Sequence, residues 1–124
     1  MKLIAKNDEV ISFLSNNESL ISGTIESIKI QNKSNVLCIG LNINLMYSKT
    51  NKTIFLEFKL VKEYGFFYSS SLSFYNIERF KFFKDDNLFY ISFDPFSEQE
   101  EMGREENDND FILSQEVYLY SMIE

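Results

Sequence analysis

The sequence of 124 residues contains no histidine and no tryptophan, and it has only one cysteine, one proline and four glycines. Without histidine, neither a Ser-His or Cys-His nucleophile pair nor an imidazole metal site can form. The single Cys38 excludes an internal disulfide and a thiolate metal cluster, and it fits a reducing compartment. We expect Cys38 to be a buried, inert thiol, because no electropositive neighbourhood surrounds it in sequence. The scattered glycines form no phosphate-binding loop.

Long apolar runs are also missing. The start, MKLIAKNDEV, is interrupted by charge too early for a signal peptide, and no run reaches the length of a membrane span. We therefore expect a cytoplasmic protein that has no membrane partner. Scattered lysines and a net charge of −7 disfavour nucleic acid as a partner.

Apolar residues are abundant: they make up 44% of the chain, with 13 Phe and 7 Tyr. A chain of this size and composition can bury one core, so we predict a single domain over residues 1–124.

The clearest periodic signal is strict alternation over residues 37–47. Six apolar residues, Leu37, Ile39, Leu41, Ile43, Leu45 and Tyr47, occupy every second position. Residues 54–61 alternate in the same way after a short polar link, which predicts a hairpin of two half-buried strands. Further strands are expected at 25–30, 71–77, 78–83, 88–93 and 111–120, with turns at 31–35 and 84–87. Residues 7–17 predict a short helix with Asn7 or Asp8 as its N-cap.

Strands with one apolar face, joined by short polar turns, are typical of antiparallel sheets. We predict a mainly β fold, or α+β with one short N-terminal helix. The expected architecture is an antiparallel bent sheet, a sandwich or a partly open barrel.

The connection over residues 94–110, DPFSEQEEMGREENDND, holds the whole excess of negative charge. Its eight carboxylates and one arginine, Arg104, sum to −7, while eleven acidic and eleven basic residues balance in the rest of the chain. We hypothesise that this segment is a mobile acidic loop that steers a basic partner. The alternative is a solubilising insertion that contacts nothing. The expected partner-binding carboxylates are Asp94, Glu98, Glu100, Glu101, Glu105, Glu106, Asp108 and Asp110.

The sequence gives weaker support for catalysis or calcium binding by this segment. Asp94 with Glu98 could act as paired carboxylates, but glycoside hydrolysis needs a shaped cleft. Asp108-Asn109-Asp110 offers oxygen ligands for calcium, yet the spacing, central glycine and closing Glu of an EF-hand are missing. We expect no catalytic residue, no metal site and no cofactor.

Tyrosines form the second candidate surface. In the last expected strand, Phe111, Leu113, Val117 and Leu119 line the core side. Tyr90, Tyr118, Tyr120 and Met122 fall in the register opposite the expected core of their strands, so they would form an aromatic patch beside the acidic segment if these strands pair. The alternative is that this patch is a second core covered by another element.

The sequence resembles small β-rich immunity proteins of bacterial polymorphic-toxin and contact-dependent growth-inhibition systems. The resemblance is carried by ESLISGTIESIKIQNKSNVLCIGLNI and by FYISFDPF with DNDFILSQEVYLY. It implies a non-enzymatic protein that binds and neutralises a cognate toxin domain, which is often basic and in some cases a nuclease. Two alternatives are a small-ligand or carbohydrate-binding β domain and an accessory protein of a phage or mobile element. The sequence predicts no oligomeric state.

Overall fold

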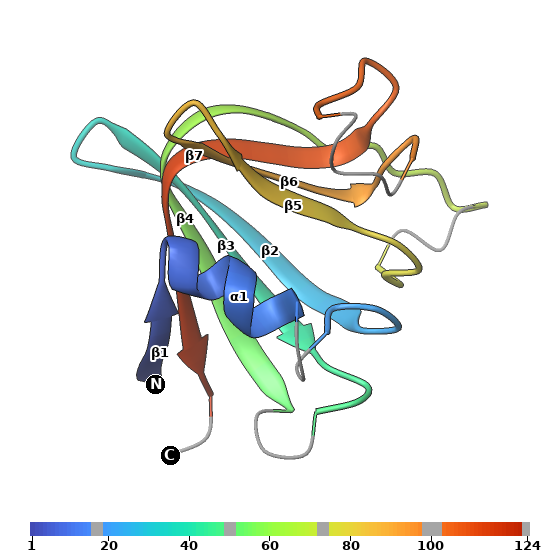
Figure 1. Ribbon diagram of the computed structural model, residues 1–124, viewed down its shortest axis with the longest axis horizontal. Coiled ribbons are helices and arrows are strands. Elements are labelled where there is room, and N and C mark those ends of the chain that lie inside the picture. The colour runs from blue at the N-terminus through green and yellow to red at the C-terminus, as the bar shows by residue number, and fades with distance from the viewer. Residues whose placement is uncertain (16–18, 49–51, 72–74, 98–102, 123–124) are drawn as a thin grey trace.

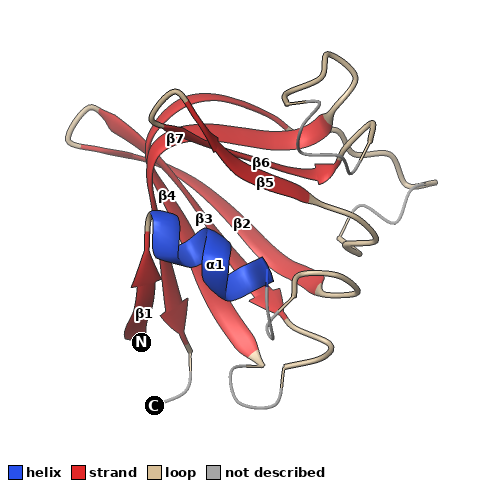
Figure 2. Ribbon diagram, viewed as in Figure 1, coloured by secondary structure: helices blue, strands red, loops and turns tan. Residues whose placement is uncertain are grey.

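The computed structural model describes residues 1–15, 19–48, 52–71, 75–97 and 103–122 (Figure 1). Seven strands and one helix follow each other in the order β1 (Lys2–Lys6), α1 (Asp8–Ser15), β2 (Thr24–Lys33), β3 (Val36–Asn44), β4 (Thr53–Gly65), β5 (Lys81–Asp85), β6 (Leu88–Asp94) and β7 (Asn109–Ser121). The predicted mainly β class with one short N-terminal helix is confirmed (Figure 2).

All strands pair antiparallel in one sheet, in the order β2-β3-β4-β7-β6-β5, with β1 added beside β7. The long strand β7 organises this sheet. One of its edges pairs with β4, while the other pairs first with β6 and then with β1. Both β4 and β7 bend sharply, so the sheet folds over into two arms (Figure 1). The sheet is strongly bent but does not close into a barrel, and β2 and β5 are the ends of the strand order.

The predicted hairpin over residues 37–47 and 54–61 is confirmed as β3 and β4, with Leu41 opposite Leu56 and Ile43 opposite Ile54. These side chains are fully buried. The strand β3 ends at Asn44, so Tyr47, expected to extend the buried row, lies exposed in the following loop.

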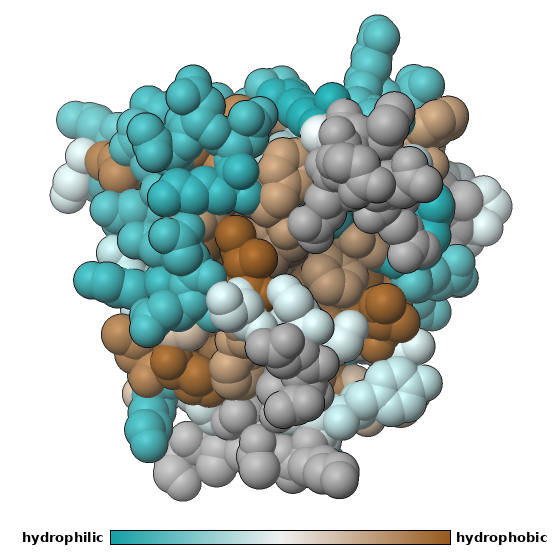
Figure 3. All heavy atoms as spheres, viewed as in Figure 1, coloured by the Kyte–Doolittle hydropathy of each residue, from teal (hydrophilic) through white to brown (hydrophobic). Residues whose placement is uncertain are grey.

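The helix α1 covers the concave side of the sheet (Figure 2), and its Val10 and Leu14 are fully buried in the core. Ile11, Phe13 and Phe80 are partly buried at the margin of this core. Apolar surface emerges at the centre of this face, between the two arms of the sheet, whereas hydrophilic residues cover the upper left (Figure 3).

Two tight turns have the chemistry that their geometry needs. Ser34 and Asn35 join β2 to β3, and Asp86 and Asn87 join β5 to β6, each with positive φ at both residues. Two-residue hairpin turns of this kind match the twist of the strands, and Asn and Asp tolerate positive φ. Both turns were predicted within 31–35 and 84–87.

The structure differs from the sequence prediction at two strands. In the segment 71–77, predicted as a strand, residues 72–74 lie outside the described ones. Residues 75–77 form an isolated bridge between Asn76 and Thr24, with backbone hydrogen bonds to Ile25 and Gly23, but no strand. The strand β1 was not predicted, because a five-residue run with two lysines carries almost no periodic signal.

The predicted faces of the last strand were also wrong. Phe111, Leu113, Val117 and Leu119 were expected on one side, but the buried residues of β7 are Asp110, Ile112, Ser114, Val117, Leu119 and Ser121. The alternation slips by one residue between Ser114 and Val117, where pairing with β6 has ended and pairing with β1 has not begun. Asn7 fills this gap. Its N–H donates to the Val117 carbonyl at 2.7 Å, and its Oδ1 accepts from the Val117 N–H at 3.0 Å. The Asn7 side chain therefore joins α1 to the bend of β7.

Candidate functional site

The acidic segment connects the end of β6 to the start of β7. Asp94–Ser97 and Gly103–Asp110 lie within the described parts of the chain, while Glu98, Glu100 and Glu101 lie outside them. The described part is anchored to the sheet at several points by hydrogen bonds and ion pairs.

A buried lysine is the main anchor. Lys81, the first residue of β5, has a fully buried side chain. Its Nζ lies 2.8 Å from the Gly103 carbonyl, 2.9 Å from Glu105 Oε1 and 3.2 Å from Asp108 Oδ2. A buried ammonium is tolerated only when it is paired and hydrogen-bonded, and here all its partners come from the acidic segment.

Asp108 is the other half of this ion pair, and its side chain is also fully buried. Besides Lys81, its carboxylate accepts hydrogen bonds from the Tyr90 hydroxyl at 2.8 Å, from the Phe96 N–H at 2.8 Å and from the Glu105 N–H at 3.0 Å. Burial alone would raise the pKa of Asp108. The two backbone N–H groups, the Tyr90 hydroxyl and Lys81 outweigh burial and lower that pKa.

Tyr90 contributes its hydroxyl to this network, and only 1% of its surface is exposed. Burial, reinforced by the hydrogen bond to the Asp108 carboxylate, raises the pKa of the Tyr90 hydroxyl. The expectation that Tyr90 lies on an outward face was therefore wrong, as was the expectation that the carboxylate of Asp108 faces a partner.

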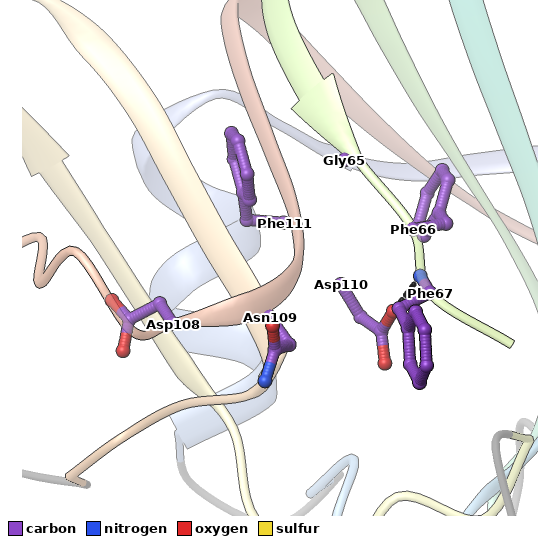
Figure 4. Close-up of a pocket in the computed structure, with 7 residues that line it drawn as sticks. All are labelled: Gly65, Phe66, Phe67, Asp108, Asn109, Asp110 and Phe111. Carbon is purple, nitrogen blue, oxygen red and sulfur yellow. Dashed lines mark hydrogen bonds between the residues drawn. The ribbon is translucent and has the colours of Figure 1, made fainter.

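Asp110 lies two residues further on and points away from Asp108 (Figure 4). Its side chain accepts a hydrogen bond from the Phe67 N–H at 2.8 Å, which ties the segment after β4 to the start of β7. Burial raises the pKa of Asp110, and the nearby Asp94 adds to this effect, although the Phe67 N–H acts against it. Asp110 lines a pocket of about 200 Å³ together with Gly65, Phe66, Phe67, Asp108, Asn109 and Phe111.

Arg104, the single cation of the segment, is held at the surface. Its Nη2 donates to Glu63 Oε2 at 2.7 Å, and its guanidinium lies 4.8 Å from the centre of the Phe111 ring. The hydrogen bond from Arg104 lowers the pKa of Glu63. A second cavity of about 360 Å³ is lined here by Glu63, Tyr90, Arg104, Glu105, Glu106, Asp108 and Phe111.

Three large aromatic side chains stand exposed beside this network. Phe67, Tyr68 and Phe96 have 58%, 60% and 61% of their surface exposed. The backbone N–H groups of Phe67 and Phe96 bond to Asp110 and Asp108, so the buried carboxylates fix the positions from which both rings project. We call these three aromatics, with the exposed Glu63, Asp94 and Glu106, the acidic–aromatic end.

Tyr118 and Tyr120 lie elsewhere. Tyr90 is paired with Leu113, whereas Tyr118 lies opposite Glu57 and Tyr120 opposite Phe55. Leu113 and Tyr120 are seven positions apart on β7, or about 23 Å along the strand. These two tyrosines are half-buried on the outer face of the sheet and do not form the expected patch with Tyr90 beside the acidic segment.

The sequence contained a signal for the residues that were missed. The run GFFYSSS follows an alternating strand, and three consecutive aromatics beyond a strand end cannot all face one core. Lys81, between Phe80 and Phe82, interrupts an aromatic run, but its partners Glu105 and Asp108 lie more than twenty positions away and no local pattern identifies them.

The arrangement of the carboxylates in the acidic segment does not support a metal site. Within the described ranges, no group of three or more Asp, Glu, Cys or His side chains could hold a metal ion. The same ranges contain no helix that is long and apolar enough to cross a membrane.

Comparison with known proteins gives no identity: no family model matches the chain, and searches of curated proteins and of solved structures found no match.

Proposed function

We propose that this chain is a non-enzymatic, cytoplasmic protein-binding module that acts as an immunity protein and neutralises a cognate bacterial toxin domain. The observation that carries the proposal is the acidic–aromatic end: Phe67, Tyr68 and Phe96 project into solvent next to carboxylates on a rigidly anchored segment.

Each half of this surface has a role in binding. Exposed aromatic rings supply apolar contact area at the centre of an interface, where most binding energy concentrates. Carboxylates around them attract a cationic partner over longer distances and accelerate encounter. A basic toxin domain, such as one with a cationic cleft for nucleic acid, fits this combination.

The anchoring of the segment favours tight binding. The Lys81–Asp108 pair and the Asp110–Phe67 hydrogen bond order the backbone that carries Phe67 and Phe96 before any partner arrives. A surface that is ordered in the free protein loses less conformational entropy on association. In this proposal the buried charges organise the surface, and the rings and outer carboxylates contact the toxin.

Co-expression tests the proposal directly. We expect a toxin domain to be encoded immediately upstream of this chain's gene; that domain is produced in bacteria with and without the chain, and growth is measured. We expect the chain to restore growth and to co-purify with the toxin domain. Replacing Phe67 and Phe96 by Ala should weaken binding by about a hundredfold. Tyr47→Ala, which removes another aromatic with 65% exposure, should bind normally. A toxin domain that still arrests growth and does not bind the chain contradicts the proposal.

A small-ligand or carbohydrate-binding domain is the second candidate, and one observation favours it. A groove of about 480 Å³ lies on the outer face of the sheet, where the rings of Phe55 and Tyr120 are 6.0 Å apart. Gln31, Asn42 and Glu57 add polar groups, and the buried Oδ1 of Asn42 accepts no hydrogen bond from the described residues. Binding of a glycan that is lost in Tyr120→Ala and kept in the Phe67/Phe96 variant would favour this candidate over the first.

A further inference from the structure

One edge of the sheet is open over a long stretch. The strand β2 pairs with β3 from Thr24 to Lys33 along one side. On its other side, the N–H of Ile25 donates to the Tyr75 carbonyl at 2.8 Å, and Thr24 bridges to Asn76. Among the described residues, none pairs with this second edge beyond Ile25. Residues 27–33 therefore present a row of backbone donors and acceptors that can accept another strand.

The side chains along this edge alternate in character. Ile28 and Ile30 lie in the register of the core, opposite Leu41 and Ile39. Ile30 is nevertheless 43% exposed, and no strand of the described residues pairs with β2 on this side of it. Ser27, Lys29, Gln31 and Lys33 occupy the outer register. A strand that pairs with this edge should therefore carry an apolar residue opposite Ile30. Opposite Lys29 and Lys33 it should carry neutral or acidic residues.

We propose that this edge pairs with the same edge of a second copy of the chain, forming an antiparallel, two-fold-symmetric dimer in which Ile30 of the two copies meet. A two-fold axis perpendicular to the sheet keeps both apolar faces on one side, so core-register residues meet core-register residues. The proposal is independent of the proposed function.

Charge repulsion distinguishes the symmetric registers that this dimer could adopt, which differ in the residue at the centre of the paired strands. Centring the pair on Lys29 places the two copies of Lys29 opposite each other, and centring it on Gln31 places Lys29 opposite Lys33 twice. Like charges directly opposite are unfavourable. Centring on Ile30 places Lys29 opposite Gln31 and Lys33 opposite Ser27, and it is the register that uses all of residues 27–33.

The same register brings opposite charges together at its two ends. Glu26 immediately precedes the open edge, and its carboxylate bonds to Asn44 Nδ2. Asn44 belongs to the outer register of β3, the face that also carries Lys33. In the antiparallel pair, Glu26 of each copy lies opposite Ser34 and diagonal to Lys33 of the other copy. Lys33 also contacts Glu57 Oε2 of its own chain at 3.2 Å, so Lys33 would be shared between the two carboxylates, and two such contacts close the interface. The β2–β3 turn and the Gly103–Asp108 part of the acidic segment lie at opposite sides of the molecule (Figure 1), so a dimer formed at residues 27–33 leaves the acidic–aromatic end open.

Sedimentation velocity on the full chain tests the proposal. We expect the wild type to shift from monomer to dimer between about 1 and about 500 µM, the range in which a short edge-to-edge contact becomes populated. Ile30→Glu places two carboxylates opposite each other and should weaken dimerisation at least about tenfold. Ile21→Glu changes another exposed isoleucine, 40% exposed and outside the edge, and should dimerise normally.

Charge reversal identifies the register. Glu26→Lys and Lys33→Glu should each weaken self-association about tenfold, because like charges then meet twice. An equimolar mixture of these two variants should form a heterodimer, since both ion pairs are restored in that combination alone. Circular dichroism confirms that each variant is folded. A wild type that stays monomeric throughout, or single variants that do not recombine when mixed, would overturn the proposal.

Discussion

Lys81 is the residue on which the acidic segment depends most. Its fully buried ammonium contacts Gly103, Glu105 and Asp108, which lie more than twenty positions later in the chain. Removing one partner of a buried ion pair leaves the other charge uncompensated, which costs far more than the pair contributes as a whole. Replacing Lys81 or Asp108 alone should therefore cost more stability than the ion pair contributes, and replacing both should cost less than the sum of the two single changes.

We expect Lys81→Met to lower the free energy of unfolding by about 3–5 kcal/mol, because Asp108 then remains buried without its counter-charge. Urea denaturation measures this change. Lys84→Met, on the same strand, removes an exposed lysine that lies 3.4 Å from Asp8 and should cost about 0–1 kcal/mol. The double variant Lys81→Met with Asp108→Asn should be less destabilised than the sum of its single variants by about 1–3 kcal/mol. Strict additivity would show that the two side chains do not interact.

Two carboxylates separated by one residue should respond to pH in opposite directions. The folded-state pKa of Asp108 is lowered below its ordinary value of 3.8, so its contribution is present above pH 3.8 and is lost as pH falls through the folded pKa. The folded-state pKa of Asp110 is raised, so its contribution is present below pH 3.8 and is lost as pH rises through the folded pKa.

Asp108→Asn should therefore destabilise the protein at pH 7, and its deficit should shrink in acid. Asp110→Asn should be at least as stable as the wild type at pH 7, because the amide oxygen can still accept from the Phe67 N–H, and this advantage should vanish in acid. Urea denaturation of both variants and of the wild type, at pH 7 and in acid, measures these differences in stability. Deficits of the same sign at pH 7 would mean that burial does not dominate at Asp110.

Single residues also show where sequence reasoning stops. The acidic segment could be recognised from charge alone, but its division into buried and exposed carboxylates could not. That division depends on Lys81, a residue that pairs with Asp108 only after β5, β6 and β7 are side by side. Tyr90 was placed outside because its strand alternates, yet both faces of β6 are covered around it.

At the scale of elements, the hairpin of β3 and β4 shows close packing on the outer face. A Cβ added to Gly40 would lie 2.5 Å from Cζ of Phe55, so the ring of Phe55 occupies the space that a side chain would fill. Glycine inside a strand often marks such a close approach.

Gly40→Ala should consequently be destabilising by about 1 kcal/mol in the wild-type chain, because the ring of Phe55 must move. In a Phe55→Ala background the same substitution should be stabilising by about 0.5–1 kcal/mol, since alanine then only restricts the unfolded chain. Thermal and urea unfolding of the four proteins in this cycle measure the change of sign. An equal effect in both backgrounds would mean that the ring does not occupy this position.

Elements with regular alternation were predictable, and those that bend were not. β3 and β4 keep a strict period, so their pairing and their buried residues followed from the sequence. β7 changes its buried face near Gln115 because its neighbour on one edge changes there, and no residue type marks that point. β1 is defined by its pairing with β7 rather than by any pattern of its own.

At the scale of the whole molecule, the net charge is distributed less simply than the sequence suggested. Glu105 and Asp108 neutralise Lys81, and Arg104 is paired with Glu63 on β4. The segment therefore presents fewer free carboxylates than its composition implies. Glu98, Glu100 and Glu101 lie outside the described residues, and the prediction that they attract a basic partner rests on the sequence alone.

Replacing Glu98, Glu100 and Glu101 by Gln should slow association with the toxin domain and flatten its dependence on salt. Three charges removed near a cationic partner reduce electrostatic steering, which acts on the encounter rate, whereas exposed charges contribute about 0–1 kcal/mol each to stability. Glu105 is kept because its carboxylate lies 2.9 Å from the buried Lys81, so its loss would disturb folding as well as charge. A matched variant with Glu9→Gln, Asp85→Asn and Asp86→Asn removes three exposed charges, one on α1 and two at the β5–β6 turn, and should associate at nearly the wild-type rate. Stopped-flow association at low and at high salt separates the two variants. If both associate at the wild-type rate at low salt, the acidic segment does not steer, and binding depends on the rings of Phe67, Tyr68 and Phe96.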